Sequence, residues 1–269
     1  MRPSWTHFPL ALIGVIALAP SVFMVVTSLR SAGEYAARKV ALPSDPSLGN
    51  YISALVEHPF LRWGLNSLLL TGGAVLLSTV VAVLAAYAIA RMRFPGRNVL
   101  LGVSTSLMVV PPVTMIVPLF VLYTQLGLIN TFGGTILIYA GLITPFGVFL
   151  LTTFFRTLPN ELFEAATLDG AGSFRTLLSV VLPLSMPALL SLVVVNALYV
   201  WNDLLVAIIF LQDDDRRTLM AGISVFQGRY NNNVPLTMAG LTLASLPMLA
   251  LYLAFQRYFI RGLMAGAVK

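Results

Sequence analysis

Few side chains in this sequence could do covalent or metal chemistry. There is no cysteine, and the two histidines, His7 and His58, lie far apart along the chain, so they cannot form a cluster of metal ligands. A nucleotide-hydrolysing loop needs a glycine-rich turn that ends in a lysine, but neither Lys39 nor Lys269, the only lysines, follows such a turn. No nucleophile–base pair and no paired carboxylates stand out. We therefore expect a chain that is not an enzyme and that binds no metal and no cofactor.

The polar residues with the most informative spacing lie in the segment 156–186, between two apolar stretches. Glu161 and Glu164 fall early in a predicted short helix, where the helix dipole favours negative charge. Gly170 tolerates the positive φ angle that a sharp turn after this helix requires. The helix also carries residues at helical spacing, some of them small enough to let another surface approach: Leu162, Ala165, Ala166 and Asp169.

A second short helix is predicted after the turn. Ser173 can cap its first turn, and Pro183 would end it. Its apolar residues recur at the spacing of a single helical stripe: Phe174, Leu177, Leu178 and Val181. From the pattern alone, the whole segment could be a docking surface for a partner or a hairpin that lies on lipid headgroups.

A third group of polar residues surrounds Asp203, the one acid inside a long apolar stretch. An ionisable residue in such a place is a functional hypothesis by default. Aromatic and amide side chains accompany it: Asn196, Tyr199, Trp201 and Asn202. An aromatic face beside polar acceptors would suit a sugar, which offers apolar C–H faces and hydroxyl edges. Alternatively, Asp203 hydrogen-bonds a neighbouring helix and fixes the packing, and the sequence leaves both roles open.

The elements that position these residues are membrane spans. The 269 residues are 58% hydrophobic and 10% charged, whereas soluble domains carry about 25% charged residues. The prediction is therefore an all-α, polytopic membrane protein, a single transmembrane domain over residues 1–269. Its net charge of +6 is assigned to residues that flank the spans, with no role in nucleic-acid binding. Six stretches reach the roughly 20 residues that cross a bilayer: about 8–29, 65–90, 98–123, 133–155, 187–211 and 236–258.

The orientation follows from two basic segments that contain no acid. The link 91–97 carries three arginines, and the tail 257–269 carries two arginines and a lysine. Such segments stay in the cytoplasm, which places both termini and the segment 156–186 on the cytoplasmic side. Several spans also contain prolines, which kink helices either for packing alone or, in the third span, around a translocation path: Pro20, Pro111, Pro112, Pro118, Pro145 and Pro247.

The spacing of the segment 156–186 resembles a known motif. The string Glu164-Ala165-Ala166, then Gly170, then Leu182-Pro183 is similar to the EAA loop of ABC importer permeases, with Val180 where that family usually has isoleucine. The fuller run Glu-Ala-Ala-Thr-Leu-Asp-Gly-Ala-Gly looks like the carbohydrate branch of the family, of the maltose-permease type. Three further segments resemble the same branch, so that the resemblance covers nearly the whole chain: 91–96, the Trp-Asn-Asp run 201–203 and the tail 262–269, which lacks the usual last glycine.

The resemblance implies a role for each part. The first helix of the loop would be a coupling helix that sits in a cleft of a separate ATPase, and the tail would reach toward the same subunit. The residues implied for coupling are Glu161, Glu164, Ala165, Ala166, Leu168, Asp169, Gly170 and Pro183. Those implied for the tail contact are Arg261, Gly262, Gly266 and Lys269.

The resemblance also implies a set of partners. They are a second, homologous permease, a dimer of ATPase subunits that binds ATP and Mg²⁺, and an extracytoplasmic substrate-binding protein, all at a prokaryotic cell membrane. The solute would be a sugar or a sugar-like molecule. The main alternative is a secondary transporter driven by an ion gradient, a class that usually places coupling residues near the midplane and often shows internal repeats. Only Asp203 is available for that role, and no repeat is visible.

Overall fold

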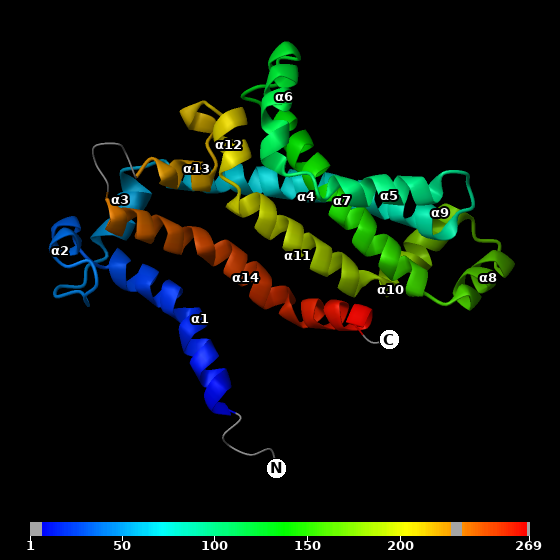
Figure 1. The fold of residues 1–269 in the computed structure, drawn as a ribbon, viewed down its shortest axis with the longest axis horizontal. Coiled ribbons are helices and arrows are strands. Elements are labelled where there is room, and N and C mark those ends of the chain that lie inside the picture. The colour runs from blue at the N-terminus through cyan, green and yellow to red at the C-terminus, as the bar shows by residue number, and fades with distance from the viewer. Residues whose placement is uncertain (1–6, 227–232, 268–269) are drawn as a thin grey trace. The chain divides into compact units, whose positions relative to one another are not determined.

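The computed structural model describes residues 7–226 and 233–267, and within these ranges the side chains of residues 7, 10 and 257–267 are outside the description. All regular elements in the described ranges are helices (Figure 1). The α-helices are α1 (His7–Ser28), α2 (Ala32–Ala37), α3 (Gly49–Val56), α4 (Phe60–Arg91), α5 (Arg97–Leu107), α6 (Pro112–Gln125), α7 (Phe132–Thr157), α8 (Asn160–Leu168), α9 (Ser173–Thr176), α10 (Leu182–Leu184), α11 (Met186–Asn202), α12 (Leu205–Phe210), α13 (Leu219–Ser224) and α14 (Val234–Ala267). A π-helical turn, Leu177–Val181, and a 3₁₀ turn, Asp214–Arg216, complete the set.

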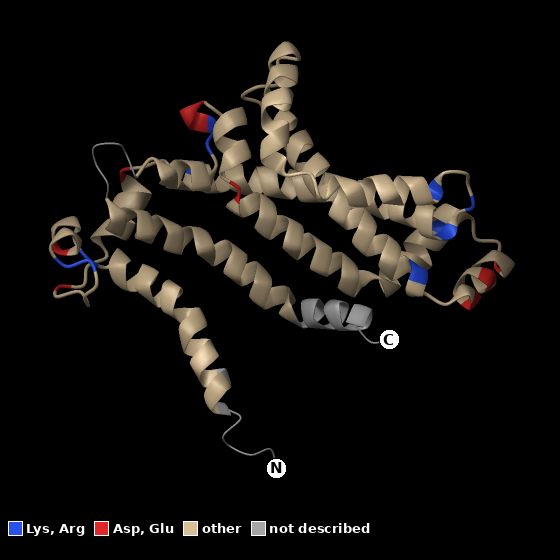
Figure 2. Ribbon diagram, viewed as in Figure 1, with Lys and Arg blue, Asp and Glu red and all other residues tan. Residues whose placement is uncertain are grey.

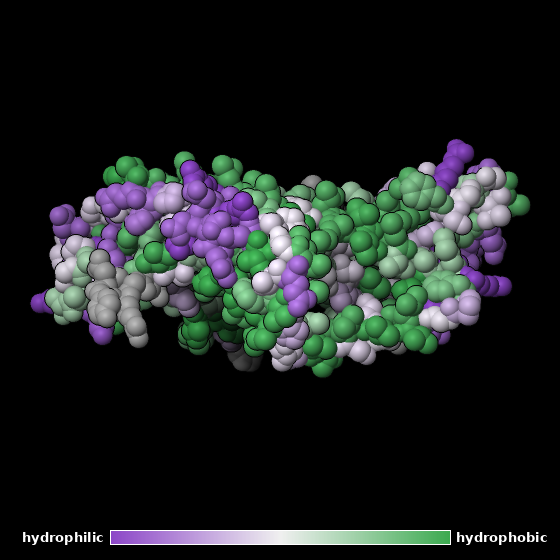
Figure 3. All heavy atoms as spheres, turned by 90° about the horizontal axis from the view of Figure 1, so that it is seen from above, coloured by the Kyte–Doolittle hydropathy of each residue, from purple (hydrophilic) through white to green (hydrophobic). Residues whose placement is uncertain are grey.

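Four of the described helices are long and apolar enough to cross a membrane, and there are six such spans if each of two bent helix pairs counts as one. The bent pairs are α5 with α6, at 99°, and α9–α10 with α11, at 78°. Five of the six predicted spans fall on these elements, whereas the predicted fifth span, 187–211, covers α11 and α12, and the bent pair joins α11 to the helical segment before it. The face seen in Figure 3 carries hydrophobic side chains over much of its area, as expected where lipid replaces water.

The third and fifth predicted spans are not continuous helices, which corrects the sequence-based prediction. In the third, α5 ends at Leu107 and α6 begins at Pro112. Neither Pro111 nor Pro112 can donate a backbone hydrogen bond, and a residue before proline avoids helical angles, so the helix is interrupted there. In the fifth, α11 ends at Asn202 and α12 follows after two residues.

The other four prolines that were predicted inside spans lie in continuous helices. The structure therefore shows a sharp bend where two prolines are adjacent and unbroken helix at the isolated ones: Pro20 in α1, Pro118 in α6, Pro145 in α7 and Pro247 in α14.

Contacts divide the chain into two compact units, Met1–Asn66 with Arg217–Pro247 and Ser67–Arg216 with Met248–Lys269. In the first unit, the side chain of Arg30 is buried and donates to the carbonyl oxygens of Glu34 (3.0 Å) and Arg38 (2.5 Å). The backbone N–H and hydroxyl of Ser44 donate to the Glu34 carboxylate and hold its pKa below the usual range. These bonds order the connection between α1 and α3.

The second unit contains the residues that the sequence analysis singled out: the two predicted helices of the segment 156–186 and the polar group around Asp203. Its core is formed by α4, α7 and α11, which approach closely at Gly147 of α7. A Cβ atom at Gly147 would lie 2.8 Å from the Cβ of Ala82 in α4 and 3.3 Å from Leu192 in α11. Small residues allow such close helix contacts in membranes, where no hydrophobic effect drives helices together.

We expect Gly147→Ala to destabilise the protein by about 1–3 kcal/mol, because an added methyl group overpacks this three-helix contact. Thermal aggregation in detergent measures the effect as a lower midpoint. The matched control is Gly133→Ala in the same helix, where a Cβ atom would have no neighbour within 4 Å. Equal midpoints for the two variants would contradict the packing described here.

Candidate functional site

The first candidate site is the surface of α8, which projects past the end of α7 (Figure 1). Seven of the nine residues of α8 are exposed, and four of these recur at positions i, i+3, i+4 and i+7, so they share one face of the helix: Glu161, Glu164, Ala165 and Leu168. Leu168 is 89% exposed, which is unusual for a large apolar side chain. Ala166, by contrast, is buried, so the two small residues of the motif serve different surfaces.

The turn after α8 has the geometry of a Schellman motif. The N–H of Ala171 donates to the carbonyl of Ala166 (2.9 Å), and the N–H of Gly170 donates to the carbonyl of Thr167 (3.0 Å). Gly170 has φ +71°, a conformation that costs other residues free energy. The predicted positive φ at this glycine is confirmed. Gly172 has φ −70° and takes no part in the reversal.

The second half of the loop differs from the prediction in several ways. Gly172, and not Ser173, is the N-cap of α9, and no side chain caps that helix. The backbone then widens into the π-helical turn, in which the N–H of Leu182 donates to the carbonyl of Leu177. Contrary to the prediction, Pro183 does not end the helix but lies within α10, and because it has no N–H to continue an α-helical ladder, the irregular turn precedes it.

The wide turn also divides the predicted apolar stripe. Leu177 and Val181 are buried in the core between α4, α7 and α11, whereas Phe174 and Leu178 are exposed. The second part of the loop is thus anchored in the second unit by two side chains. In Figure 2 the ribbon is blue, for basic residues, around the junction of α4 and α5 and red, for acidic residues, on α8.

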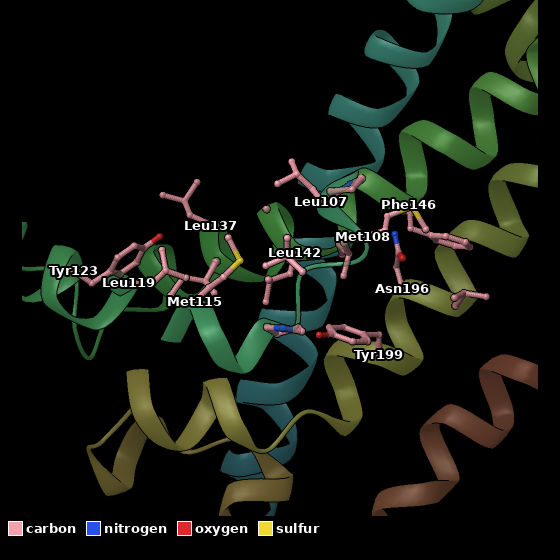
Figure 4. A pocket seen from close by; sticks show the side chains of 17 residues that line it. Leu107, Met108, Met115, Leu119, Tyr123, Leu137, Leu142, Phe146, Asn196 and Tyr199 are labelled. Atoms are coloured by element: carbon pink, nitrogen blue, oxygen red, sulfur yellow. The ribbon is translucent and has the colours of Figure 1, made fainter. Parts of the chain in front are cut away.

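The second candidate site is a cavity of about 540 Å³ in the second unit. It is lined by α6, α7 and α11 and by the break between α5 and α6, and Figure 4 shows Asn196 reaching from α11 toward Met108. The described residues that line it carry no charge. Asn196 is only 2% exposed, and its Nδ2 atom has no hydrogen-bond partner among the described residues. A buried amide without a partner is costly, so the cavity has an unused donor.

The five residues predicted around Asp203 are separated by the structure. Asn196 and Tyr199 line the cavity, and the other three lie outside its lining. Trp201 is buried, at 4% exposure, and the exposed Asn202 donates to the carbonyl of Leu198 in its own helix (2.8 Å).

Asp203 joins two helices at the break in the fifth span. Its Oδ1 atom accepts a hydrogen bond from the hydroxyl of Tyr139 in α7 (2.7 Å) and another from the N–H of Val206 in α12 (2.9 Å). The acid therefore satisfies one of the free N–H groups at the start of α12. These two bonds are what the packing role requires.

The predicted tail contact cannot be placed. The backbone of α14 continues through Arg261, Gly262 and Gly266, so the sixth span and the start of the tail form one helix. The side chains of this stretch, and all of Lys269, lie outside the described residues.

Two features of the sites were missed in the sequence. The cavity depends on residues from four separate segments, among them Met108, Met115 and Phe146, which look like ordinary span residues when taken singly. The adjacent prolines at 111 and 112 had indicated a bend in the third span, and this bend creates one wall of the cavity, but no local pattern indicated the other walls. The other missed feature, the set of contacts of Arg91, is described below.

The fold and sites define a polytopic helical membrane subunit that presents a short exposed helix between two spans. Residues 78–264 match the family of binding-protein-dependent transport system inner membrane components. The chain belongs to this family, and it is the non-catalytic, multi-pass membrane subunit of an ATP-driven importer that works with a substrate-binding protein.

Individual relatives resemble almost the whole chain. The melibiose/raffinose/stachyose import permease MelC of Bacillus subtilis is 35% identical over 260 residues, which is 96% of this chain and 94% of that protein. The diacetylchitobiose uptake permease NgcG of Streptomyces coelicolor is 31% identical over 266 residues, 98% and 88% of the two chains. A chain of a bacterial ABC transporter for alginate import has the same fold, with a TM-score of 0.80, 22% identity and 94% and 95% coverage.

A double-mutant cycle on Tyr139→Phe and Asp203→Ala tests whether their hydrogen bond stabilises the fold. We expect a coupling of about 1.5–3 kcal/mol, since the acceptor is a carboxylate and Tyr139 is only 1% exposed. The measurement is the unfolding midpoint of each variant in detergent. If Tyr139→Phe leaves stability unchanged and lowers only transport, Asp203 acts on the solute and the packing role is wrong.

Proposed function

We propose that the chain forms half of a translocation pathway for a neutral sugar or sugar-like solute. A separate ATPase binds the exposed face of α8 and thereby moves the spans of this chain. The observation that carries the coupling part is this face, with Glu161, Glu164, Ala165 and Leu168 uncovered on a helix outside the apolar core. An exposed leucine beside a small alanine offers an apolar contact at close range, and the two acids offer ion pairs at its edge.

The proposed solute is a neutral saccharide, and two observations support this proposal. The relatives MelC and NgcG are named for melibiose, raffinose and stachyose and for diacetylchitobiose. The cavity of about 540 Å³ lies in the usual range of small-molecule sites, roughly 300–1,000 Å³. Its aromatic side chains and the free amide of Asn196 suit the apolar faces and hydroxyl groups of a sugar, and its described lining offers no cation for an acidic one.

The proposed assembly contains four kinds of component. This chain pairs with a second, homologous permease, and together they complete the pathway. A dimer of ATPase subunits holds ATP and Mg²⁺ and docks on α8, and the binding protein delivers solute from the other side. The basic segments 91–97 and 257–269 support a cytoplasmic location for α8 and for both termini, in a prokaryotic cell membrane. Closure of the ATPase dimer would then rock the spans and alternate access to the cavity.

Uptake into proteoliposomes distinguishes this mechanism from an ion-driven carrier. The assembled complex should accumulate solute only when ATP and the binding protein are present. Uptake that persists without the ATPase subunits and follows an imposed ion gradient would instead support the secondary-transporter alternative.

We expect Gly170→Val to abolish ATP-driven uptake and to leave membrane insertion intact. A β-branched residue at φ +71° is strained by about 1–3 kcal/mol, which displaces α8 from the geometry that the ATPase contacts. Uptake and membrane content are measured in parallel with Gly172→Val, a control at φ −70° and ψ 164°, angles that valine readily adopts. Normal uptake by Gly170→Val would count against the role of α8.

The variant Asn196→Leu tests the cavity as part of the pathway. Leucine has a similar size but no donor, so the solute would lose one hydrogen bond in the cavity, worth about 0.5–1.5 kcal/mol, or roughly three- to tenfold in affinity. We expect uptake to need more substrate-loaded binding protein, while basal ATP hydrolysis by the complex stays the same. An unchanged uptake curve would place the pathway elsewhere.

A further inference from the structure

We propose that Arg91, at the end of α4, is the joint that makes α8 move with the spans. This inference rests on the proposed coupling role of α8 and adds a positioning residue that transmits the movement. The sequence analysis assigned Arg91 to orienting the chain in the membrane, as one of three arginines in the link 91–97, and predicted no contact with the loop for it. In the structure Arg91 contacts α7 and α8, whereas Arg97 donates a hydrogen bond within the link itself.

The first set of contacts is with the end of α7. The Nη2 atom of Arg91 donates to the carbonyl oxygens of Phe155 and Leu158, the latter at 2.6 Å. Carbonyls in the last turn of a helix lack their usual α-helical partner, and that of Phe155 accepts a bond of 3.3 Å from the N–H of Leu158; the dipole also favours a cation there. Phe155 itself is fully buried in the core between α4, α7 and α11. The guanidinium therefore fixes the end of α4 to the end of α7.

The second set of contacts is with α8. The Nη1 atom of Arg91 donates to Oδ1 of Asn160, the first residue of α8, at 2.9 Å. Its Cζ atom lies 4.0 Å from the ring centroid of Phe163, one turn further along, within the range of a cation–π contact. One guanidinium, carried by α4, thus contacts both α7 and α8.

These contacts matter because the covalent connection between α7 and α8 is very short and has no helical structure. Only Leu158 and Pro159 lie between the helices, both with extended backbone angles, at ψ 136° and ψ 141°. Proline fixes its own φ and restricts the residue before it, so the angle between the two helices can change only through the few dihedrals that remain, chiefly the ψ of Pro159. Arg91 binds the end of α7 and the start of α8 at once. A force on α8 is therefore transmitted to α4 and α7, and it does not only bend the connection between α7 and α8.

The joint requires arginine and not only a positive charge. A planar guanidinium can donate in several directions and stack on a ring at the same time, whereas the ammonium of lysine is a point charge that cannot reproduce this arrangement. Arg97 provides a matched control, since it carries the same charge in the same link and donates to the carbonyl of Met92 within that link (3.2 Å).

The test compares Arg91→Ala, Arg91→Lys and Arg97→Ala in the reconstituted complex, with the amount of solute transported per ATP hydrolysed as the readout. We expect Arg91→Ala to lower this ratio roughly tenfold, within the range of ordinary coupling energies. Arg91→Lys should restore little of it, and Arg97→Ala should match the wild type. A ratio in Arg91→Ala equal to that in Arg97→Ala would overturn the proposal.

A second measurement separates loss of the joint from loss of assembly. Spin labels on Thr167→Cys in α8 and Phe149→Cys in α7 report the distance between these helices, and the chain has no native cysteine to interfere. We expect a broader distance distribution with Arg91→Ala in the assembled complex, or in the purified chain if that variant does not assemble. An unchanged distribution refutes the joint. If Gly170→Val blocks uptake in the same preparation, the coupling role of α8 stands even when the joint does not.

Discussion

Backbone hydrogen bonding in an apolar solvent is the constraint on which this structure depends. Lipid supplies no partner for a free N–H or carbonyl group, so irregular backbone survives only where other protein groups satisfy it. The second unit has irregular backbone at several places, and three of them show different ways of satisfying it. Adjacent prolines remove the donors at the break before α6, Asp203 accepts from the start of α12, and Arg91 donates to the end of α7.

The same three places border the parts of the molecule that we connect with transport. The break before α6 forms one wall of the cavity, the break at Asp203 ends the helix that carries Asn196, and Arg91 lies beside α8. In a regular helix the backbone N–H and carbonyl groups form hydrogen bonds with one another, so the helix needs no further partners. Interrupted helix needs specific partners, which Asp203 and Arg91 supply at two of these places.

The sequence predicted the elements well where local chemistry decides them. The span positions follow from apolar length, and the turn at Gly170 follows from the conformational freedom of glycine. The prediction of an unbroken fifth span was wrong, because Asp203 finds a partner, Tyr139, that lies 64 residues earlier in the chain. The cavity and the contacts of Arg91 were missed for the same reason, since residues from several helices create them and no local pattern records which helices become neighbours.

The bond between Asp203 and Tyr139 bears on how the chain is made. An aspartate at the centre of an inserting helix costs about 2.5–3.5 kcal/mol, and Asp203, at the end of α11, carries a smaller cost of the same kind, which disfavours entry of that segment into the bilayer. Tyr139 belongs to α7, which leaves the ribosome well before α11, so its hydroxyl is already in the membrane when the acid arrives. We therefore expect the later segment to enter against a partner already present, so that biosynthetic order helps an otherwise poorly inserting helix to integrate.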